Sequence, residues 1–178
     1  MYSVEKNVQI LLAVLKANHI RKEVVSPGTT NISLIVSMVN DGSFEMYSAV
    51  DERGAAYIAC GLASESGEAV VITCTGATAS RNYFPGLTEA YHRKLPILAV
   101  TASQDFSRVG NLSPQFIDRT VQPTDAVRMS VQVPVVRNDN DEFDCTLKIN
   151  KAVLELFHRG GGPVHINLAS EYKNDFSV

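Results

Sequence analysis

The sequence has no excess of positive charge and no apolar run long enough to cross a membrane. Its 16 Lys and Arg residues are outnumbered by 19 Asp and Glu residues, which gives a formal net charge of −3. Nucleic-acid-binding domains usually carry a basic patch, and a membrane-spanning helix needs about 20 consecutive apolar residues. We therefore expect no nucleic-acid partner and no membrane insertion.

Cysteine is scarce, and its spacing does not suggest a disulfide framework. The three cysteines, Cys60, Cys74 and Cys145, are odd in number and far apart, and no Cys-x-x-Cys pair occurs. The N-terminal residues 1–6 are partly charged and contain no apolar signal-peptide core. Together these features indicate a protein of the reducing cytoplasm.

Internal repeats, low-complexity linkers and phosphate-binding glycine motifs are also absent. No Gly-x-Gly-x-x-Gly or P-loop pattern follows any of the apolar segments, which argues against a nucleotide-binding α/β protein. With 178 residues, of which 45% are hydrophobic and 20% charged, the chain has the length and apolar content of one globular domain.

Short apolar or β-branched segments alternate regularly with segments of helical periodicity. The stretch 69–74 is almost continuously apolar, as in a strand that is buried on both faces. We expect further strands at 23–26, 44–50, 95–101, 131–136 and 164–168, and helices at 4–18, 31–39, 52–65, 78–93 and 141–158. This alternation predicts an α/β fold, with a single doubly wound, mainly parallel sheet and helices on both faces.

Three polar turns follow predicted strands, at 26–31, 51–52 and 75–78. Ligands of parallel α/β sheets bind at the carboxyl ends of the strands, so all three turns should lie on one edge. Glu52 stands there, before a run of Gly and Ala at 54–63 that a flat ligand or another backbone can approach closely. A carboxylate in that position is a candidate for chemistry. The alternative is that Glu52 only caps its own helix or interacts favourably with the helix dipole.

In their order and spacing, three motifs resemble the N-terminal pyrimidine-binding (PYR) domain of thiamine-diphosphate-dependent enzymes in the acetohydroxyacid synthase and pyruvate decarboxylase superfamily. They are Val-Ser-Pro-Gly-Thr-Thr-Asn at 25–31, Asp-Glu-Arg-Gly-Ala-Ala at 51–56, and Thr-Cys-Thr-Gly-Ala-Thr-Ala at 73–79, the last continuing through 82–87 and 89–91 to 96–98. The residues found in these three motifs look closest to those of the SEPHCHC synthase branch of the menaquinone pathway. The resemblance implies a thiamine-diphosphate-binding fold over 1–170 and leaves 171–178 as a polar tail or truncated linker.

The resemblance implies a specific role for Glu52. In the family, the matching glutamate hydrogen-bonds a ring nitrogen of the cofactor's aminopyrimidine and shares or donates a proton there. The imino form that this favours activates thiamine diphosphate for attack on a 2-keto acid. The resemblance therefore implies a 2-keto-acid decarboxylase or a carboligating synthase, which is a lyase or a transferase.

Other positions match the family less specifically. For Gly28 and Thr29 the resemblance implies a border of the pyrimidine and substrate space, and an ordinary Pro-Gly-Thr turn is the alternative. For the third motif it implies packing beside the cofactor, and a plain strand-to-helix turn is the alternative. Gln115, in the long polar segment 104–124, matches a glutamine that faces the substrate in family members. The cofactor-binding residues expected in and after the third motif are Thr75, Gly76, Ala77 and Asn82.

Two departures from the family pattern bear on substrate and cofactor. Thr30 stands where the synthase branch tends to have an arginine, which argues against the menaquinone substrate. The diphosphate-binding (PP) half of such enzymes carries a Gly-Asp-Gly motif followed by Asn-Asn, which holds the metal, and this pattern is absent here. We therefore expect no metal ligand in this chain. The resemblance implies that a PP-domain chain or a missing C-terminal region holds Mg²⁺ and the diphosphate, and that the chain is inactive alone.

The resemblance also implies assembly, because in this family the cofactor lies between a PYR domain and a PP domain that often belongs to a neighbouring subunit. We expect a homo- or hetero-oligomer, for which the small-residue helices at 54–63 and 77–91 would offer a flat apolar surface. The alternative hypothesis is a non-catalytic PYR-like domain that acts as a structural or regulatory partner.

Overall fold

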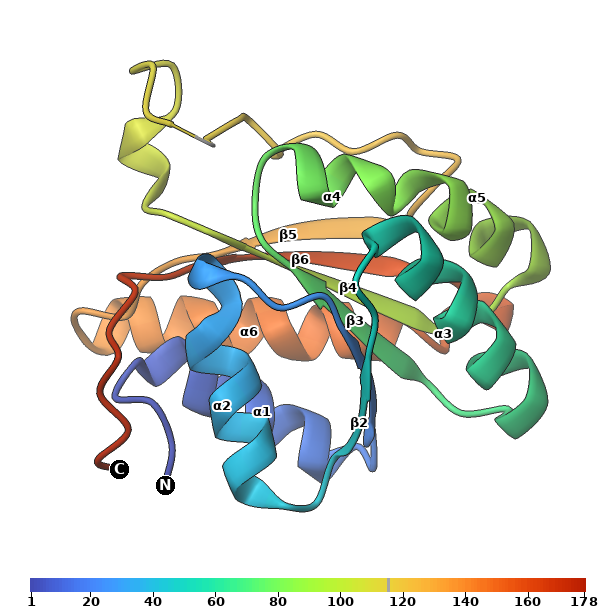
Figure 1. Cartoon of the computed structure of the whole chain (residues 1–178), viewed down its shortest axis with the longest axis horizontal. Helices are drawn as coiled ribbons and strands as arrows, with labels where there is room; N and C mark the ends of the chain where they lie inside the picture. Colours follow the sequence, from blue (N-terminus) through green and yellow to red (C-terminus); the bar gives the residue numbers. More distant parts are fainter. Residues whose placement is uncertain (115) are drawn as a thin grey trace.

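A six-stranded sheet forms the centre of the chain, for which the computed structural model describes residues 1–114 and 116–178. The strand order is β2-β1-β3-β4-β6-β5, and every neighbouring pair runs parallel (Figure 1). The predicted doubly wound, parallel sheet is thus confirmed. The strands are β1 (Lys22–Val25), β2 (Glu45–Ser48), β3 (Val70–Cys74), β4 (Ile97–Ser103), β5 (Met129–Val133) and β6 (Val164–Ala169).

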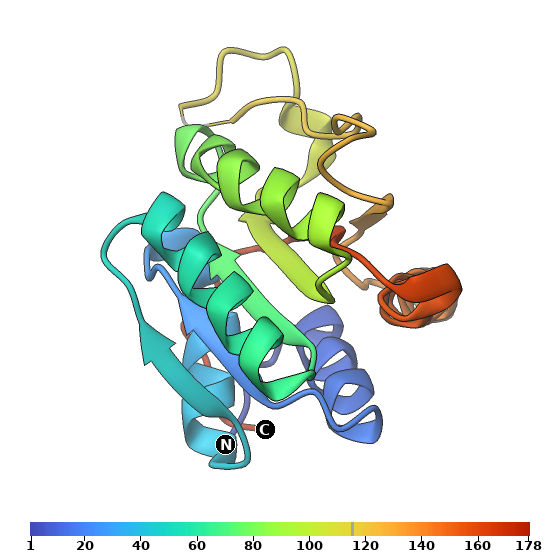
Figure 2. The same ribbon diagram turned by 90° about the vertical axis from the view of Figure 1, so that its right-hand side faces the viewer.

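Helices cover both faces of the sheet, because each parallel connection must cross over it. The face that we call the upper face carries α3 (Glu52–Ser66), α4 (Thr78–Asn82) and α5 (Phe84–Arg93). Residues 104–114 and 116–128, between β4 and β5, pass on the same side as α4 (Figure 1). The opposite face carries α1 (Lys6–Ala17), α2 (Ile32–Asp41) and α6 (Asp139–Glu155), as Figure 2 shows from the side.

Two apolar cores lie on the two sides of the sheet, and alternate residues of the strands supply them. In β3, Val71 packs into the core beneath α1, α2 and α6, while Val70 and Ile72 pack against α3 and α5. All five residues of β3 are buried. A strand that is buried on both faces cannot alternate between polar and apolar residues, which accounts for its apolar run.

Two prolines end a helix and a strand earlier than the hydrophobic pattern predicts. The helix expected at 78–93 is divided, because α4 ends at Asn82 and α5 begins at Phe84. Pro85 has no N–H to donate to the carbonyl of Arg81, and its ring crowds that turn. The strand expected at 131–136 is β5, which ends before Pro134, a residue that cannot donate to a ladder.

The two termini lie side by side at one end of the domain (Figure 1). The backbone N–H of Val4 donates to the carbonyl of Asp175 at 3.0 Å. The buried carboxylate of Glu5 accepts a hydrogen bond of 2.9 Å from the backbone N–H of Glu171. The segment 171–178, expected as a polar tail or truncated linker, is thus held against the N-terminal residues.

Candidate functional site

The polar turns that follow β1, β2 and β3 lie together at the carboxyl edge of the sheet. The three strands are neighbours in parallel register, with Val25 of β1 opposite both Ser48 of β2 and Thr73 of β3. The turns 26–31, 51–52 and 75–78 therefore leave the sheet at the same level, as the sequence predicted. We call these three turns the turn edge.

Glu52 is the first residue of α3, and its neighbour caps the helix. The side chain of Asp51 accepts a hydrogen bond of 2.7 Å from the backbone N–H of Gly54, as an N-cap does. The carboxylate of Glu52 is half-buried and accepts a hydrogen bond of 3.3 Å from Nδ2 of Asn82 in α4. The helix dipole favours a negative charge at this position. Because Asp51 serves as the cap, the carboxylate of Glu52 remains available to a ligand at the turn edge.

The small residues of α3 serve helix packing within the chain. Ala55, Ala56 and Ala59 are buried, and a Cβ on Gly86 of α5 would lie only 3.0 Å from the carbonyl carbon of Ala56. The thiol of Cys60 is 3.4 Å from the carbonyl oxygen of Gly86. These small residues bring α3 and α5 into close contact, while Tyr57, Ile58 and Gly61 of the same helix are exposed. The oligomer surface expected on these helices stays a prediction.

Gly28 and Thr75 connect the first and third turns of the turn edge. Gly28 has extended backbone with φ −166°, and a Cβ there would overlap Cγ2 of Thr75. Glycine is therefore required at this position by the contact, and the backbone conformation alone would accept any residue. Thr29 is exposed, whereas Thr30 donates a hydrogen bond of 3.2 Å to the carbonyl of Ala102 at the end of β4.

Asn31 holds the first turn in place, and sequence reasoning did not single it out. Its side chain is buried, with Oδ1 accepting a hydrogen bond of 2.8 Å from the backbone N–H of Gly28. Its Nδ2 donates to the carbonyl of Ser26 at 3.1 Å. The signal that could have found Asn31 is its place after a Pro-Gly turn, since Asn often closes such loops with its side chain.

The third turn is packed from within the chain. A Cβ on Gly76 would lie 2.7 Å from Nη1 of Arg119 and 3.1 Å from the carbonyl oxygen of Ala102. Ala77 is buried and adopts φ 55° and ψ −130°, a region that L-residues rarely occupy. Thr75 and Gly76 are partly exposed. The turn is therefore held in one conformation by its neighbours.

The structure brings together all but one of the residues that the sequence analysis selected. Glu52 and the cofactor-binding candidates lie at the turn edge or, in the case of Asn82, are bonded to it. Gln115, the expected substrate-facing residue, lies outside the described residues.

Tyr83 and Cys74 are two buried groups beneath the turn edge. Tyr83 is fully buried, and burial raises its pKa well above the ordinary value. Burial also raises the pKa of the Cys74 thiol to about 12. Cys60, Cys74 and Cys145 are all buried free thiols. The Tyr83 hydroxyl and the Cys74 thiol are therefore neutral at neutral pH.

Arg119 is the charged residue of this region that sequence reasoning missed. It lies between β4 and β5, outside any helix or strand, and is only 2% exposed. Its Nη2 donates to Oδ1 of Asn167 in β6 at 2.9 Å, and burial lowers its pKa to about 10. An arginine in an irregular polar segment has no local pattern that distinguishes a buried side chain from an exposed one.

Within residues 1–114 and 116–178, no group of three or more His, Cys, Asp or Glu side chains is placed to hold a metal ion. The helices described for the same residues include none long and apolar enough to span a membrane.

Comparison with known proteins identifies relatives of this chain. The family model for the thiamine pyrophosphate enzyme, N-terminal TPP binding domain, matches residues 6–129. The 2-succinyl-5-enolpyruvyl-6-hydroxy-3-cyclohexene-1-carboxylate (SEPHCHC) synthase of Phocaeicola vulgatus is 36% identical over 168 residues, which cover 94% of this chain and 30% of that protein. The same synthase of Porphyromonas gingivalis is 34% identical over 175 residues, covering 94% of this chain and 29% of the relative. The chain thus spans about 30% of the length of these relatives.

A solved structure has the same fold. The thiamine diphosphate-dependent 4-hydroxybenzoylformate decarboxylase of Rhodococcus jostii RHA1 superposes with a TM-score of 0.77 at 20% identity, covering 92% of this chain and 30% of that one. The resemblance inferred from the three motifs, including its SEPHCHC synthase branch, is confirmed by these matches. The chain belongs to the family of N-terminal TPP binding domains of thiamine pyrophosphate enzymes.

Proposed function

We propose that this chain supplies the pyrimidine-binding half of a thiamine diphosphate centre, in which Glu52 activates the aminopyrimidine of the cofactor. The placement of the Glu52 carboxylate carries the proposal. It lies at the turn edge, is half-buried, is free of helix capping and accepts a hydrogen bond from Asn82. A carboxyl group held in this way can share a proton with a ring nitrogen.

The turn edge fits the aminopyrimidine end of the cofactor. The turns built on Gly28 and Gly76 are packed tightly against their neighbours, so they form a preformed wall for a flat ring. We assign Thr29, Thr75 and Ala77 to the same wall. Gln115 is proposed to face the substrate.

We propose that the diphosphate and Mg²⁺ are held by a PP-domain chain or by a C-terminal region of a longer protein. The described residues contain no cluster of metal-binding side chains, and the related synthases are about three times as long. A homo- or hetero-oligomer would bring the two halves of the centre together. The buried free thiols fit a reducing, cytoplasmic location.

The proposed mechanism divides the work between the cofactor and the chain. When bound, thiamine diphosphate supplies the nucleophilic carbon that adds to a 2-keto acid. Glu52 holds a proton at its carboxylate toward the ring nitrogen, and Asn82 orients that carboxylate. The buried side chains of Cys74 and Tyr83 exclude water from the floor of the site.

The reaction class that we propose is a 2-keto-acid decarboxylase or a carboligating synthase. Relatives named as synthases and a similar fold named as a decarboxylase support this class. Thr30, at the position where the synthase branch tends to have arginine, is bonded to Ala102 and offers no charge to an acidic substrate. We therefore propose a substrate other than the menaquinone precursor.

Replacement of Glu52 in the complete enzyme tests the catalytic role. In Glu52→Gln, kcat for the 2-keto acid should fall by about 10²- to 10⁴-fold, the usual contribution of a positioned acid or base, while assembly is retained. Glu65→Gln, an exposed change at the far end of the same helix, is the matched control and should leave kcat unchanged. Unchanged turnover in Glu52→Gln would reject the proposal and favour the non-catalytic PYR-like partner domain.

Calorimetric titration tests whether the cofactor site is divided between this chain and a PP domain. Thiamine diphosphate with Mg²⁺ should release heat of binding only when the chain is mixed with its PP-domain partner. Tight binding by the chain alone would contradict the placement of the diphosphate and metal on another domain.

A further inference from the structure

On the upper face, the side chains of β6 and β5 and of the carboxyl-terminal half of β4 are mainly polar. Residues 104–114 and 116–128 pass over this polar part, whereas α3 and α5 cover the apolar part of the same face (Figures 1 and 2). The side chains that form this polar cluster are Thr101 of β4, His165 and Asn167 of β6, and Ser130 and Gln132 of β5.

Hydrogen bonds join the members of the polar cluster. The Nε2 of His165 lies 2.8 Å from Oγ1 of Thr101, and its Nδ1 lies 2.7 Å from Oγ of Ser130. Asn167 accepts a bond from Thr101 and donates one of 2.7 Å to Gln132. Burial, together with nearby arginine charge, lowers the pKa of His165 to about 3, so its imidazole is neutral. The five side chains therefore carry no charge of their own.

Arg119 adds a buried positive charge to this cluster. Its Nη2 bonds to Asn167, but its Nε and Nη1 have no hydrogen-bond partner among the described residues. The ion pairs of the described residues do not include Arg119, and Arg81 is a neighbouring charge of the same sign. A buried charge without a counter-ion is unfavourable. An anionic partner would therefore stabilise the buried charge of Arg119, and the described residues do not supply one.

Arg119 lies beside the turn edge. A Cβ on Gly76 would be 2.7 Å from its Nη1, so the guanidinium rests against the turn that follows β3. At the same end of β4, Oγ of Ser103 also has no partner among the described residues. Unpartnered buried donors are thus gathered at the edge where we place the cofactor ring.

We propose that Arg119 is the anion-binding residue of this centre and that its unpartnered N–H groups bind a carboxylate of the acid substrate. This inference rests on the proposed function. The planar guanidinium presents paired donors that match the two oxygens of a carboxylate. A phosphate oxyanion has similar chemistry, so the experiment separates the two. Under this proposal, the substrate carboxylate supplies the counter-ion that the buried guanidinium of Arg119 lacks among the described residues.

Urea unfolding of the whole chain tests the anion site without enzyme activity. The midpoint is measured at equal ionic strength in chloride, pyruvate or inorganic phosphate, since a ligand of the folded state raises it. The wild-type midpoint should be higher in pyruvate than in chloride, and this difference should vanish in Arg119→Met. In chloride, Arg119→Met should be at least as stable as the wild type, because an unpaired buried charge has been removed.

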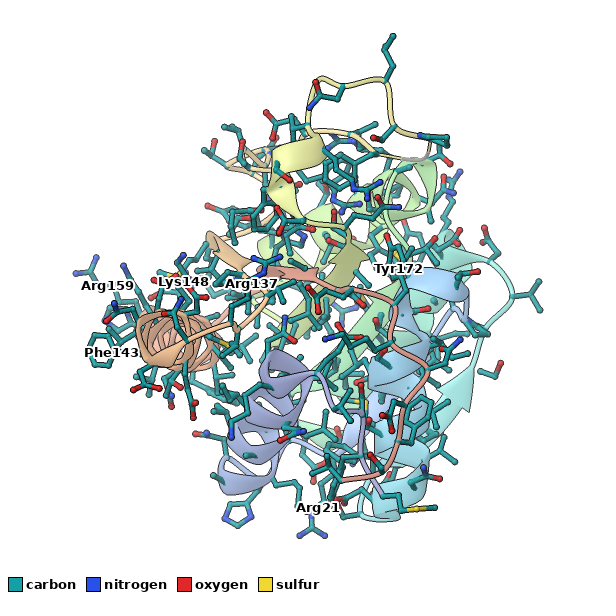
Figure 3. All side chains as sticks on the ribbon, turned by 90° about the vertical axis from the view of Figure 1, so that its left-hand side faces the viewer. Arg21, Arg137, Phe143, Lys148, Arg159 and Tyr172 are labelled. Carbon is teal, nitrogen blue, oxygen red and sulfur yellow. The ribbon has the colours of Figure 1, made fainter. Side chains whose placement is uncertain are left out.

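Two further variants make the result decisive. Arg21, exposed before β1 at the opposite end of the domain (Figure 3), is the matched control, and Arg21→Met should keep the full pyruvate effect. If Arg119→Met does not fold, Arg119→Lys keeps the charge without the planar fork and should need about tenfold more pyruvate for the same shift. A pyruvate effect that is absent from the wild type, or that survives in Arg119→Met, would overturn the proposal. An effect of phosphate alone would overturn the carboxylate assignment.

Kinetics of the complete enzyme separate this inference from the proposed function. Arg119→Met should raise KM for the 2-keto acid about tenfold or more and leave the affinity for thiamine diphosphate unchanged. Glu52→Gln should instead lower kcat. If Glu52→Gln is fully active while the pyruvate effect still depends on Arg119, the proposed function fails and the anion site stands. If Glu52→Gln lowers kcat but the pyruvate effect does not depend on Arg119, the catalytic role of Glu52 stands and the anion site is rejected.

Discussion

Nδ2 of Asn82 in α4 donates a hydrogen bond of 3.3 Å to the carboxylate of Glu52 in α3. The two helices follow different strands, since α3 comes after β2 and α4 after β3, and β1 lies between those strands in the sheet. The bond thus joins the second turn of the turn edge to the helix that follows the third turn. It fixes the direction of the carboxylate to which we assign proton transfer.

Asn82→Ala in the complete enzyme should lower kcat about two- to tenfold, because one hydrogen bond is worth about 0.5–1.5 kcal/mol. Steady-state kinetics measure this change. In a Glu52→Gln background the same replacement should have no further effect, because the two residues act through one contact. Glu65→Gln, the exposed change at the far end of α3, is again the control. Independent, additive losses from Asn82 and Glu52 would show that Asn82 does not act through Glu52.

Gly28→Ala should lower the free energy of unfolding by about 1–3 kcal/mol, the usual cost of an overpacked contact. The new methyl group would overlap Cγ2 of Thr75, while the extended backbone at Gly28 accepts alanine. Thr75→Ser removes Cγ2, so the double variant should recover most of the loss in urea unfolding. A double variant as unstable as Gly28→Ala would mean that this contact is not the cause.

Glu23 of β1 is fully buried, and neither carboxylate oxygen has a hydrogen-bond partner among the described residues. Burial raises its pKa well above the ordinary value. A group whose pKa is raised in the folded state contributes stability that is fully present below its unfolded pKa of about 4.3. That stability is lost as the pH rises through the folded-state pKa.

Glu23→Gln removes this titration and should make stability less dependent on pH. From pH 5 to pH 8, the free energy of unfolding of the variant should rise relative to that of the wild type by up to about 1.4 kcal/mol per pH unit. The variant should therefore be the more stable of the two at pH 8. Chemical denaturation across this range measures the difference. Glu45→Gln, an exposed change on the neighbouring strand, should show no comparable trend. If the difference in the free energy of unfolding between wild type and Glu23→Gln does not vary with pH, the pKa of Glu23 is not raised in the folded state.

The amino-acid sequence by itself determined the order of strands and helices and the place of Glu52 at a helix start. Both depend on local patterns. The apolar run of β3 indicated a buried strand, and the helical pattern expected at 52–65 placed Glu52 at the start of α3. The motifs at 25–31, 51–56 and 73–79 were enough to indicate the family, because a resemblance depends only on residue types in their order and spacing.

Only the tertiary structure decided which side chains meet. The bond from Asn82 to Glu52 and the contact of Gly28 with Thr75 join residues that are far apart in the sequence. The burial of Arg119 depends on the path of an irregular segment over the sheet, which no periodicity records. Glu23 lies within a strand pattern and becomes an unpartnered buried carboxyl only because helices cover both faces of β1. Burial and pairing are properties of the packed layers, so a local sequence pattern cannot specify them.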